Sequence, residues 1–154
     1  MPVTLRLATE SDGETLLSLM REYYVFDGHD FNPEKARAAL LVLLREPAFG
    51  RVWLIFAGPT IVGYVVFCFG YSLEYLGRDA FLDEFYLREN YRRRGFGTQV
   101  LKMVEDAARS LDIRAIHLEV VRRNQAAAKF YRKAGFYDHD HHLMSKRIGT
   151  GPGA

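Results

Sequence analysis

Residues 81–98 read FLDEFYLRENYRRRGFGT, and the rest of the chain is interpreted outward from this stretch. An apolar and aromatic run typical of a strand, Ala80 to Leu87, ends shortly before a cluster of arginines and glycines. From Gly95 to Leu111 the apolar residues recur with a period close to that of a helix, which predicts an amphipathic helix. The stretch therefore predicts a strand, a short basic loop and the beginning of a helix.

The basic loop has the features of an anion site. A helix N-terminus carries N–H groups without intrahelical partners and the positive end of the helix dipole. Gly95 and Gly97 would let main-chain donors approach a pyrophosphate without an intervening Cβ atom, and Arg92 to Arg94 add positive charge. The loop is not a Walker A motif, and it lacks the third glycine of the dinucleotide fingerprint. The alternative interpretation is a basic turn that only caps a helix.

The hydrophobic pattern upstream of residue 80 predicts two helices and three strands. Thr9 to Asp12 supply capping residues for the first helix, and Asn32-Pro33 begin the second, which ends before Pro47. The turn residues Gly58-Pro59-Thr60 separate two apolar runs and predict an antiparallel hairpin. The predicted strands are Val3–Ala8, Val52–Ala57 and Ile61–Tyr71.

Downstream of the central helix, Ile113 to Val121 alternates like a strand, and Asn124 caps a short helix that ends near Gly135. Residues 136–148 are predicted to form a final strand pair or hairpin, and residues 149–154 a flexible tail. This order predicts an α/β fold with a mixed sheet and helices packed on its faces. At 154 residues, we expect one domain over residues 1–148.

The composition excludes several classes of protein. Hydrophobic residues make up 49% and charged residues 26% of the chain, as in ordinary globular proteins and unlike disordered ones. The longest apolar run, residues 61–71, is much shorter than the about 20 residues of a membrane-spanning helix, so we expect no membrane partner. The first residues lack the pattern of a secretory signal, which predicts a cytoplasmic protein. The single cysteine, Cys68, lies in an apolar run and is expected to be an inert thiol.

Charge is distributed unevenly along the chain. Residues 1–89 carry 13 acidic against 8 basic residues, whereas residues 90–154 carry 6 acidic against 13 basic residues. This asymmetry favours an anionic partner, such as a phosphorylated cofactor, for the second part and a cationic group for the first. Uneven surface charge without a ligand is the alternative.

Two further motifs carry chemistry. Asn124 and Tyr131 are seven residues apart, close to two helical turns, so they share a face on which a tyrosine could protonate a leaving thiolate. The alternative is a packed aromatic pair beside an ordinary N-cap. Asp83 and Glu84 interrupt an apolar strand, and because adjacent strand residues point to opposite faces, we expect one acid on the core or cleft side and the other outside. A bulge or strand edge that leaves both acids in solvent is the alternative.

Together these motifs resemble the GNAT superfamily of N-acetyltransferases, over nearly the whole chain. The cofactor motif Arg/Gln-x-x-Gly-x-Gly/Ala is met by Arg92, Gly95 and Gly97. Residues Leu82-Asp83-Glu84 resemble the Leu-Glu-Asp triplet of the spermidine/spermine (diamine) acetyltransferase branch, with the acids in the opposite order. The later pattern Asn-x-x-Ala-x-x-Phe-Tyr-x-Lys-x-Gly-Phe is met by Asn124, Ala127, Phe130, Tyr131, Lys133, Gly135 and Phe136.

The resemblance implies a mostly antiparallel sheet with a splayed parallel strand pair, and transfer of an acetyl group from acetyl-CoA to a primary amine. It implies Tyr131 as the general acid and Asp83 as the counterpart of the branch's catalytic glutamate, with Glu84 as a rival and a water-mediated route open to either. No metal is implied, and a homodimer is common in the superfamily. The implied cofactor-binding residues are Phe85, Tyr86, Leu87, Arg92, Arg93, Arg94, Gly95, Phe96, Gly97, Thr98, Asn124 and Ala127.

Several alternatives remain open from the sequence. The acceptor is a small-molecule amine or a protein amine. A GNAT-like domain that binds acyl-CoA as a sensor without turnover is a second reading, and nucleic-acid binding through the arginines ranks lower, so no nucleic acid is expected. Residues 138–142, DHDHH, suggest a metal site, although a polar turn explains them equally well. His117 is expected to be a packed core histidine.

Overall fold

The structure, a computed structural model, describes residues 2–149. Its contacts divide the chain into two compact units, one up to Glu119 and one from Val120 onward, and each is described separately. Within the described residues no helix is long and apolar enough to cross a membrane. The single domain over residues 1–148 stays a prediction. The flexible tail was predicted over residues 149–154, and all of these except Gly149 lie outside the described residues.

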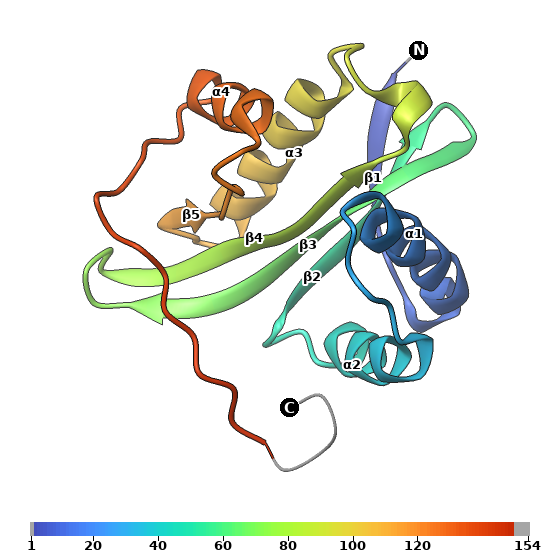
Figure 1. The fold of residues 1–154 in the computed structure, drawn as a ribbon, viewed down its shortest axis with the longest axis horizontal. Coiled ribbons are helices and arrows are strands. Elements are labelled where there is room, and N and C mark those ends of the chain that lie inside the picture. The colour runs from blue at the N-terminus through green and yellow to red at the C-terminus, as the bar shows by residue number, and fades with distance from the viewer. Residues whose placement is uncertain (1, 150–154) are drawn as a thin grey trace. The chain divides into compact units, whose positions relative to one another are not determined.

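A five-stranded mixed sheet forms the centre of the first unit (Figure 1). The strands lie in the order β1-β2-β3-β4-β5, antiparallel except for the parallel pair β4 and β5. Their bounds are β1 Val3–Leu7, β2 Gly50–Ala57, β3 Thr60–Ser72, β4 Gly77–Leu87 and β5 Ala115–His117. The predicted hairpin and the mixed, mostly antiparallel sheet are confirmed.

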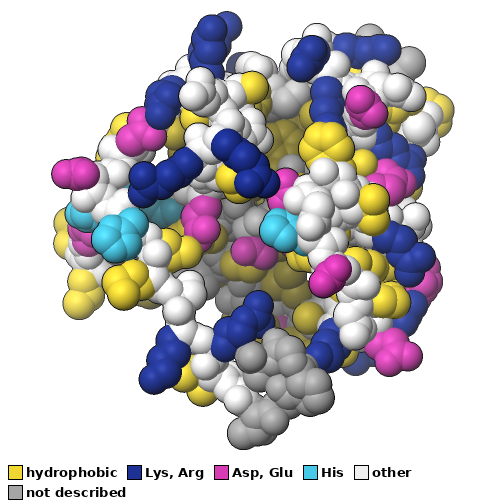
Figure 2. All heavy atoms as spheres, viewed as in Figure 1, with side chains coloured by type: hydrophobic (Ala, Val, Ile, Leu, Met, Phe, Trp, Pro, Cys, Tyr) yellow, Lys and Arg dark blue, Asp and Glu magenta, His cyan; other side chains and the backbone are white. Residues whose placement is uncertain are grey.

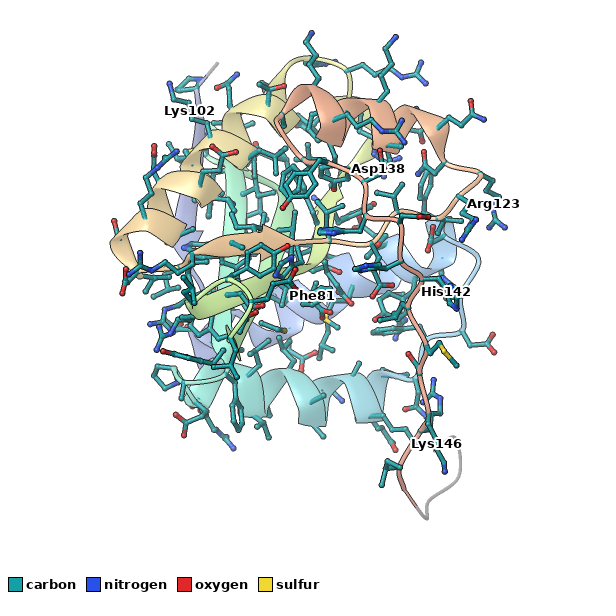
Figure 3. The ribbon with its side chains drawn as sticks, turned by 90° about the vertical axis from the view of Figure 1, so that its left-hand side faces the viewer. Phe81, Lys102, Arg123, Asp138, His142 and Lys146 are labelled. Atoms are coloured by element: carbon teal, nitrogen blue, oxygen red, sulfur yellow. The ribbon has the colours of Figure 1, made fainter. Side chains whose placement is uncertain are left out.

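Helices cover both faces of this sheet (Figure 1). The helices α1, Gly13–Phe26, and α2, Pro33–Arg45, share a core with one face of the sheet. That core is made of Leu16, Leu17, Leu19, Leu40, Val52, Leu54, Tyr64, Val66 and Tyr86, with Ala8 at its edge. The helix α3, Phe96–Ser110, buries Val100, Leu101, Val104 and Ala108 on its apolar side. The exposed Lys102 lies on the same helix (Figure 3).

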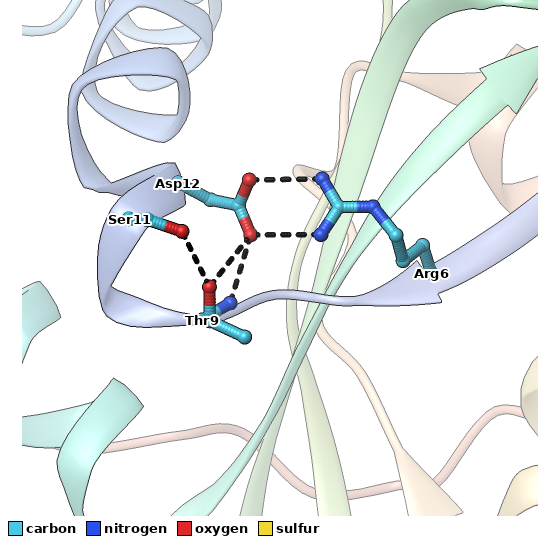
Figure 4. A network of polar contacts seen from close by, with 4 residues as sticks. All are labelled: Arg6, Thr9, Ser11 and Asp12. Carbon is cyan, nitrogen blue, oxygen red and sulfur yellow. Dashed lines mark hydrogen bonds and ion pairs between the residues drawn. The ribbon is translucent and has the colours of Figure 1, made fainter.

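The predicted capping residues begin the two first helices. At the short 3₁₀ turn η1, Glu10–Asp12, the Thr9 N–H donates to Asp12 Oδ2 at 2.8 Å, and Arg6 donates to both Asp12 oxygens (Figure 4). This capping box fixes the entry of the chain into α1. The Asn32 side chain accepts from the Lys35 N–H at 3.1 Å and caps α2. Both starts were predicted from sequence.

The strands predicted in two segments differ from the structure. The strand expected over Ile113–Val121 is only Ala115–His117, because its parallel partner on β4 is limited to Asp79–Phe81. The strand pair expected over residues 136–148 is wrong, since the described residues of this segment form no ladder. Residues 137–149 are exposed, so their polar main-chain groups can bind water instead of a neighbouring strand.

The second unit contains the helix α4, Gln125–Lys133, followed by an extended segment that carries Asp138, His142 and Lys146 (Figure 3). Asn124 caps α4, since its Oδ1 accepts from the Ala127 N–H at 3.1 Å. Gly135, with φ of 101°, ends it, because this left-handed backbone favours glycine. The predicted short helix between Asn124 and Gly135 is thereby confirmed.

Candidate functional site

A β-bulge in β4 places the acidic pair. Val66 on β3 lies opposite Glu84, whereas the next residue, Phe67, lies opposite Leu82. Asp83 is therefore an extra residue on β4 with no residue of β3 opposite it. A bulge of this kind interrupts the alternation of side chains and re-aims them.

The expectation that the two acids point to opposite faces is wrong for this reason. Glu84 hydrogen-bonds Tyr24 of α1. Asp83 lies close enough to the Cys68 thiol, which packs against the same core of α1 and α2, for that thiol to oppose the rise that burial causes in the pKa of Asp83. Both carboxylates are thus directed to the face of the sheet that α1 covers. A bulge was one of the alternatives from the sequence, but it does not leave both acids in solvent as that alternative expected, because Glu84 is partly buried and bonded to tyrosines.

Glu84 is held by two tyrosines. The Tyr24 and Tyr64 hydroxyls donate to its two oxygens, each at 2.7 Å. Burial raises the pKa of Glu84, while the two hydrogen bonds oppose that rise. Tyr64 is fully buried, and burial raises the pKa of its hydroxyl, so the hydroxyl remains a donor. Both Glu84 oxygens therefore already have donors in the protein.

Asp83 is more open than Glu84. Its side chain lies at the surface but against β3, and this partial burial raises its pKa, with an opposing hydrogen bond from the Cys68 thiol. Burial also raises the pKa of the Cys68 thiol to about 11, in accord with the expected inert thiol. A carboxylate with raised pKa and access to solvent is suited to accepting a proton from an amine.

Aromatic rings surround the acids. Tyr23 stacks on Tyr86 with ring centroids 5.6 Å apart and meets Tyr24 edge-on at 5.8 Å. Tyr24 also meets Phe31, in the connection between α1 and α2, at 5.4 Å. Carboxylates beside aromatic faces attract cations, both by charge and by the ring quadrupole. This face of β4 is therefore suited to a cationic group.

The loop after β4 has a different character. The 3₁₀ turn η2, Glu89–Tyr91, is followed by Arg93 with φ of 59° and Gly95 with φ of 77°, both left-handed. Within residues 2–149, no main-chain N–H from Arg93 to Thr98 has a hydrogen-bond acceptor in the chain, and that of Gln99 donates to Gly95 O at 3.2 Å. A Cβ atom on Gly95 would meet nothing within 4 Å, so the loop is open to a ligand. Successive free N–H groups at a helix start form a cradle for an anion.

The three arginines differ in their contacts. Arg92 is half-buried: its Nε donates to Leu87 O at 2.7 Å, and its guanidinium lies 4.2 Å from the centroid of the Phe26 ring. Arg93 and Arg94 are exposed, with Arg94 lying 5.9 Å from the Tyr91 ring. Figure 2 shows both acidic and basic side chains on the viewed face.

The strand edge between the acids and the loop is open. β4 pairs with β5 only over Asp79–Phe81, so Phe85, Tyr86 and Leu87 pair with β3 alone among the described strands. This is the splayed arrangement that the sequence resemblance implied. On this stretch the Leu87 carbonyl is occupied by Arg92.

The remaining predicted site residues belong to the second unit. The Asn124 side chain serves as the N-cap of α4, and Ala127 donates to it. The Tyr131 ring meets Phe130 at 5.1 Å and Phe136 at 5.7 Å. The structure brings Asp83 and Glu84 together and places Arg92 to Thr98 in the loop before α3 and the first turn of that helix, whereas the roles of Asn124, Ala127 and Tyr131 stay predictions.

Sequence reasoning missed Tyr24 and Tyr64 as partners of Glu84, and Cys68 as the partner of Asp83. These residues lie far from the acids along the chain, and no motif marks them. His117 is only partly buried and is not the core histidine expected, and its Nε2 lies 3.0 Å from Asp79 Oδ2. Among residues 2–149, no group of three or more His, Cys, Asp or Glu side chains is arranged to hold a metal ion.

Comparison with curated proteins finds acetyltransferases. The thialysine N-epsilon-acetyltransferase of Sus scrofa is 31% identical over 149 residues, covering 88% of this chain and 85% of that protein. The uncharacterized N-acetyltransferase YycN of Bacillus subtilis is 40% identical over 75 residues, covering 49% of this chain and 47% of that protein. The spermidine/spermine N(1)-acetyltransferase-like protein 1 of Homo sapiens is 29% identical over 82 residues, covering 53% of this chain and 12% of that protein.

Solved structures share the fold. An integron cassette protein from the mobile metagenome of Cole Harbour Salt Marsh superposes with a TM-score of 0.84 at 33% identity, covering 96% of this chain and 91% of that one. A predicted acetyltransferase from Clostridium acetobutylicum, solved with acetyl-CoA, superposes with a TM-score of 0.77 at 19% identity, covering 94% and 96%. The sequence model of the Acetyltransferase (GNAT) family matches residues 14–136, four-fifths of the chain. Because this match covers most of the sheet and both the bulge of β4 and the loop before α3, the chain belongs to the GNAT acetyltransferase family.

Proposed function

We propose that this protein transfers an acetyl group from acetyl-CoA to a primary amine. One observation carries the proposal: a single strand, β4, holds an accessible carboxylate at its bulge and leads directly into a cradle of free N–H groups. The first suits an amine, and the second suits the pyrophosphate of CoA.

The loop side would hold the acyl donor. The main-chain N–H groups of Arg93 to Thr98 lie at the start of α3, where the helix dipole has its positive end. A ligand can approach closely at Gly95, where an added Cβ atom would meet nothing within 4 Å. The open edge of β4 at Phe85 to Leu87 would accompany the pantetheine arm, and its N–H groups would stabilise charge on the thioester carbonyl oxygen. By the family resemblance, Asn124 and Ala127 would also contact CoA.

The bulge side would hold the acceptor. Aliphatic amines have pKa values of about 10, so an amine must lose a proton before it attacks the thioester at neutral pH. We assign this proton to Asp83, directly or through a water molecule, because both Glu84 oxygens already accept hydrogen bonds from tyrosines. The amine nitrogen then forms the new bond to the acetyl carbon within a ternary complex, and the thiolate leaves. Tyr131 is the group we assign to protonate that thiolate.

The acceptor class follows from the same face. Asp83, Glu84 and the tyrosine rings favour a small cationic alkyl amine over a neutral arylamine. The names of the relatives, thialysine N-epsilon-acetyltransferase and spermidine/spermine N(1)-acetyltransferase-like protein, both denote alkyl amines and support this choice. A protein amine is the competing acceptor. A homodimer and a cytoplasmic location stay predictions, the first open to light scattering on the purified protein.

The first test is thermal unfolding with acetyl-CoA. Ligand at 100 times its Kd stabilises the folded state by about 2.7 kcal/mol, which for a protein of this size raises Tm by roughly 5–10 °C. Acetate and inorganic pyrophosphate at the same concentration serve as controls and should give smaller shifts. No shift at millimolar acetyl-CoA would refute the proposal.

The second test is turnover. A panel of alkyl diamines, lysine analogues and lysine-containing peptides is incubated with acetyl-CoA, and free thiol release is followed. Release that depends on a small amine supports the proposed acceptor, whereas release with peptides alone favours a protein amine. Binding of acetyl-CoA without release in the whole panel would favour the acyl-CoA sensor.

A further inference from the structure

The contacts of Arg92 distinguish it from the two arginines that follow. Its Nε donates to Leu87 O, and its guanidinium lies 4.2 Å from the Phe26 ring centroid and 5.5 Å from that of Tyr86. The guanidinium of Arg92 thus has two aromatic rings beside it, and its Nε donor is engaged by the protein. Arg93 and Arg94, by contrast, are exposed.

Phe26 is the last residue of α1 and is 63% exposed. A ring so exposed gains little from burial, and the guanidinium of Arg92 is the partner that the structure gives it. Through this contact, Arg92 links the end of α1 to the loop that contains Gly95.

The end of α1 is itself firmly attached to β4. The Glu22 carboxylate accepts from Arg88 Nε at 3.0 Å and Nη2 at 2.8 Å, and from the Tyr86 hydroxyl at 3.1 Å. Arg88 also donates to Ile61 O at 3.1 Å. These contacts hold the end of α1, and with it Phe26, beside the residues at which β4 ends.

We propose that Arg92 and Phe26 are positioning residues for the acyl-donor loop, and that Arg92 is not itself a ligand of the donor's phosphates. The positive charge that meets the phosphates comes from Arg93 and Arg94. The proposal rests on the proposed function, because it concerns the loop that would hold acetyl-CoA. It departs from the direct cofactor-binding role that the family resemblance implied for Arg92.

The difference between arginine and lysine provides the test. A lysine at a phosphate contact keeps the charge and much of the affinity, but it cannot reproduce a stacked guanidinium that also donates through Nε. We therefore expect R92K and R92Q to weaken acetyl-CoA binding equally, by about 5- to 10-fold, from the loss of a cation–π contact and a hydrogen bond.

The dependence of Kd on salt separates charge from position. Isothermal titration of acetyl-CoA at several KCl concentrations should give R92K and R92Q the same salt dependence as the wild type. R93Q and R94Q should each weaken binding about threefold at low salt and lessen the salt dependence, because each removes an exposed charge from the donor site.

Phe26 provides an independent variant that should fold, because its ring is exposed. F26L should weaken acetyl-CoA binding about threefold with Tm unchanged, and F26Y, which keeps the ring, should restore it. If Phe26 only stabilised the fold, F26L would lower Tm, and F26Y would restore Tm together with acetyl-CoA affinity.

The outcomes separate the two proposals. Wild-type affinity in R92K with weaker, less salt-dependent binding in R92Q would overturn the positioning role, as would equal affinities of F26L and F26Y with the wild type. Either result would leave the proposed function intact. Absence of acetyl-CoA binding by the wild type itself would refute the proposed function and this inference with it.

Discussion

The bulge at Asp83 and Glu84 and the loop from Arg92 to Thr98 lie on the same strand and its continuation, yet they treat polar groups in opposite ways. At the bulge, the protein supplies partners: two tyrosine hydroxyls for Glu84 and a thiol for Asp83. In the loop, the main-chain donors have no acceptors within the described chain. The comparison separates a region whose hydrogen bonds are made within the fold from one whose main-chain donors remain available, which the proposed function assigns to the phosphates of acetyl-CoA.

The sharpest test of the bulge is the rate of transfer. Asp83→Asn removes the proposed proton acceptor with little change in shape, so kcat/KM should fall by about 100-fold or more. Acetyl-CoA affinity, measured by titration calorimetry, should stay within about twofold, since the donor loop is untouched. Glu84→Gln is the matched variant and should cost less, about tenfold, because it acts only through its tyrosines. An equal loss in both variants would remove the distinction between the two acids.

The pH profile of the wild type belongs to the same test. Burial raises the pKa of Asp83 above 3.8, so the proton-accepting form is lost as pH falls through this raised value. The acid limb of kcat/KM should therefore lie above the ordinary range of an aspartate, and Asp83→Asn should abolish it. An acid limb that persists unchanged in Asp83→Asn would assign it to another group.

In the loop, the corresponding change is Gly95→Ala. A side chain in the left-handed region costs about 1–2 kcal/mol, and since nothing lies within 4 Å of the added Cβ, the loop is free to relax away from this conformation. We expect acetyl-CoA to bind about 5- to 30-fold more weakly, measured by the ligand-induced shift in Tm. Gly13→Ala, where φ is −53°, is the control and should leave binding unchanged.

The tyrosine partners predict a smaller effect, on stability. Tyr24→Phe removes one hydroxyl from Glu84 and leaves a partly buried carboxylate oxygen without its donor. The free energy of unfolding should fall by about 1–2 kcal/mol, measured by urea denaturation. Tyr71→Phe, at a ring that is 78% exposed, should change it by less than about 0.5 kcal/mol. Equal effects of the two substitutions would show that the Glu84 contact contributes nothing to stability.

The smallest effect is expected at the Glu22–Arg88 pair beside the loop. The hydrogen bonds from Arg88 lower the pKa of Glu22 below 4.5 in the folded state. Its contribution to stability is therefore present above the unfolded pKa and is lost as pH falls through the lowered folded pKa. Because both side chains are more than a third exposed, Glu22→Gln should cost only about 0.5 kcal/mol at pH 7.

Urea titrations at pH 7 and at pH 3 check this expectation. The difference between Glu22→Gln and the wild type should shrink at the lower pH, whereas Glu74→Gln, at an exposed turn residue, should show no difference at either pH. A constant difference at both pH values would mean that the ionised pair is not its source.

Local patterns were enough for most of the fold. The capping residues Thr9 to Asp12, the Asn32-Pro33 start and the Gly58-Pro59-Thr60 turn act over a few neighbouring residues, and the structure has each of them where the sequence predicts. The period of α3 was equally legible, because a helix on a sheet needs one continuous apolar face. The glycine loop was found from sequence because left-handed backbone and close approach both select glycine.

The orientation of the two acids could not be predicted from local patterns in the same way. Simple alternation puts Asp83 and Glu84 on opposite faces, and only the register between β3 and β4 shows the extra residue that brings them to one face. The strand pair predicted over residues 136–148 was wrong for a related reason, since a segment forms a strand only where another strand offers hydrogen bonds.

By itself, the sequence determined the family, the order of helices and strands as far as α4, and the presence of a glycine-containing basic loop and an acidic pair on one strand. Only the tertiary structure decided that both Glu84 oxygens have donors within the protein, because Tyr24 and Tyr64 reach Glu84 from 60 and 20 residues away. It also decided that Arg92 contacts Phe26 of α1 while its two neighbours remain exposed. Such pairings depend on how elements pack in space, and no local propensity encodes them.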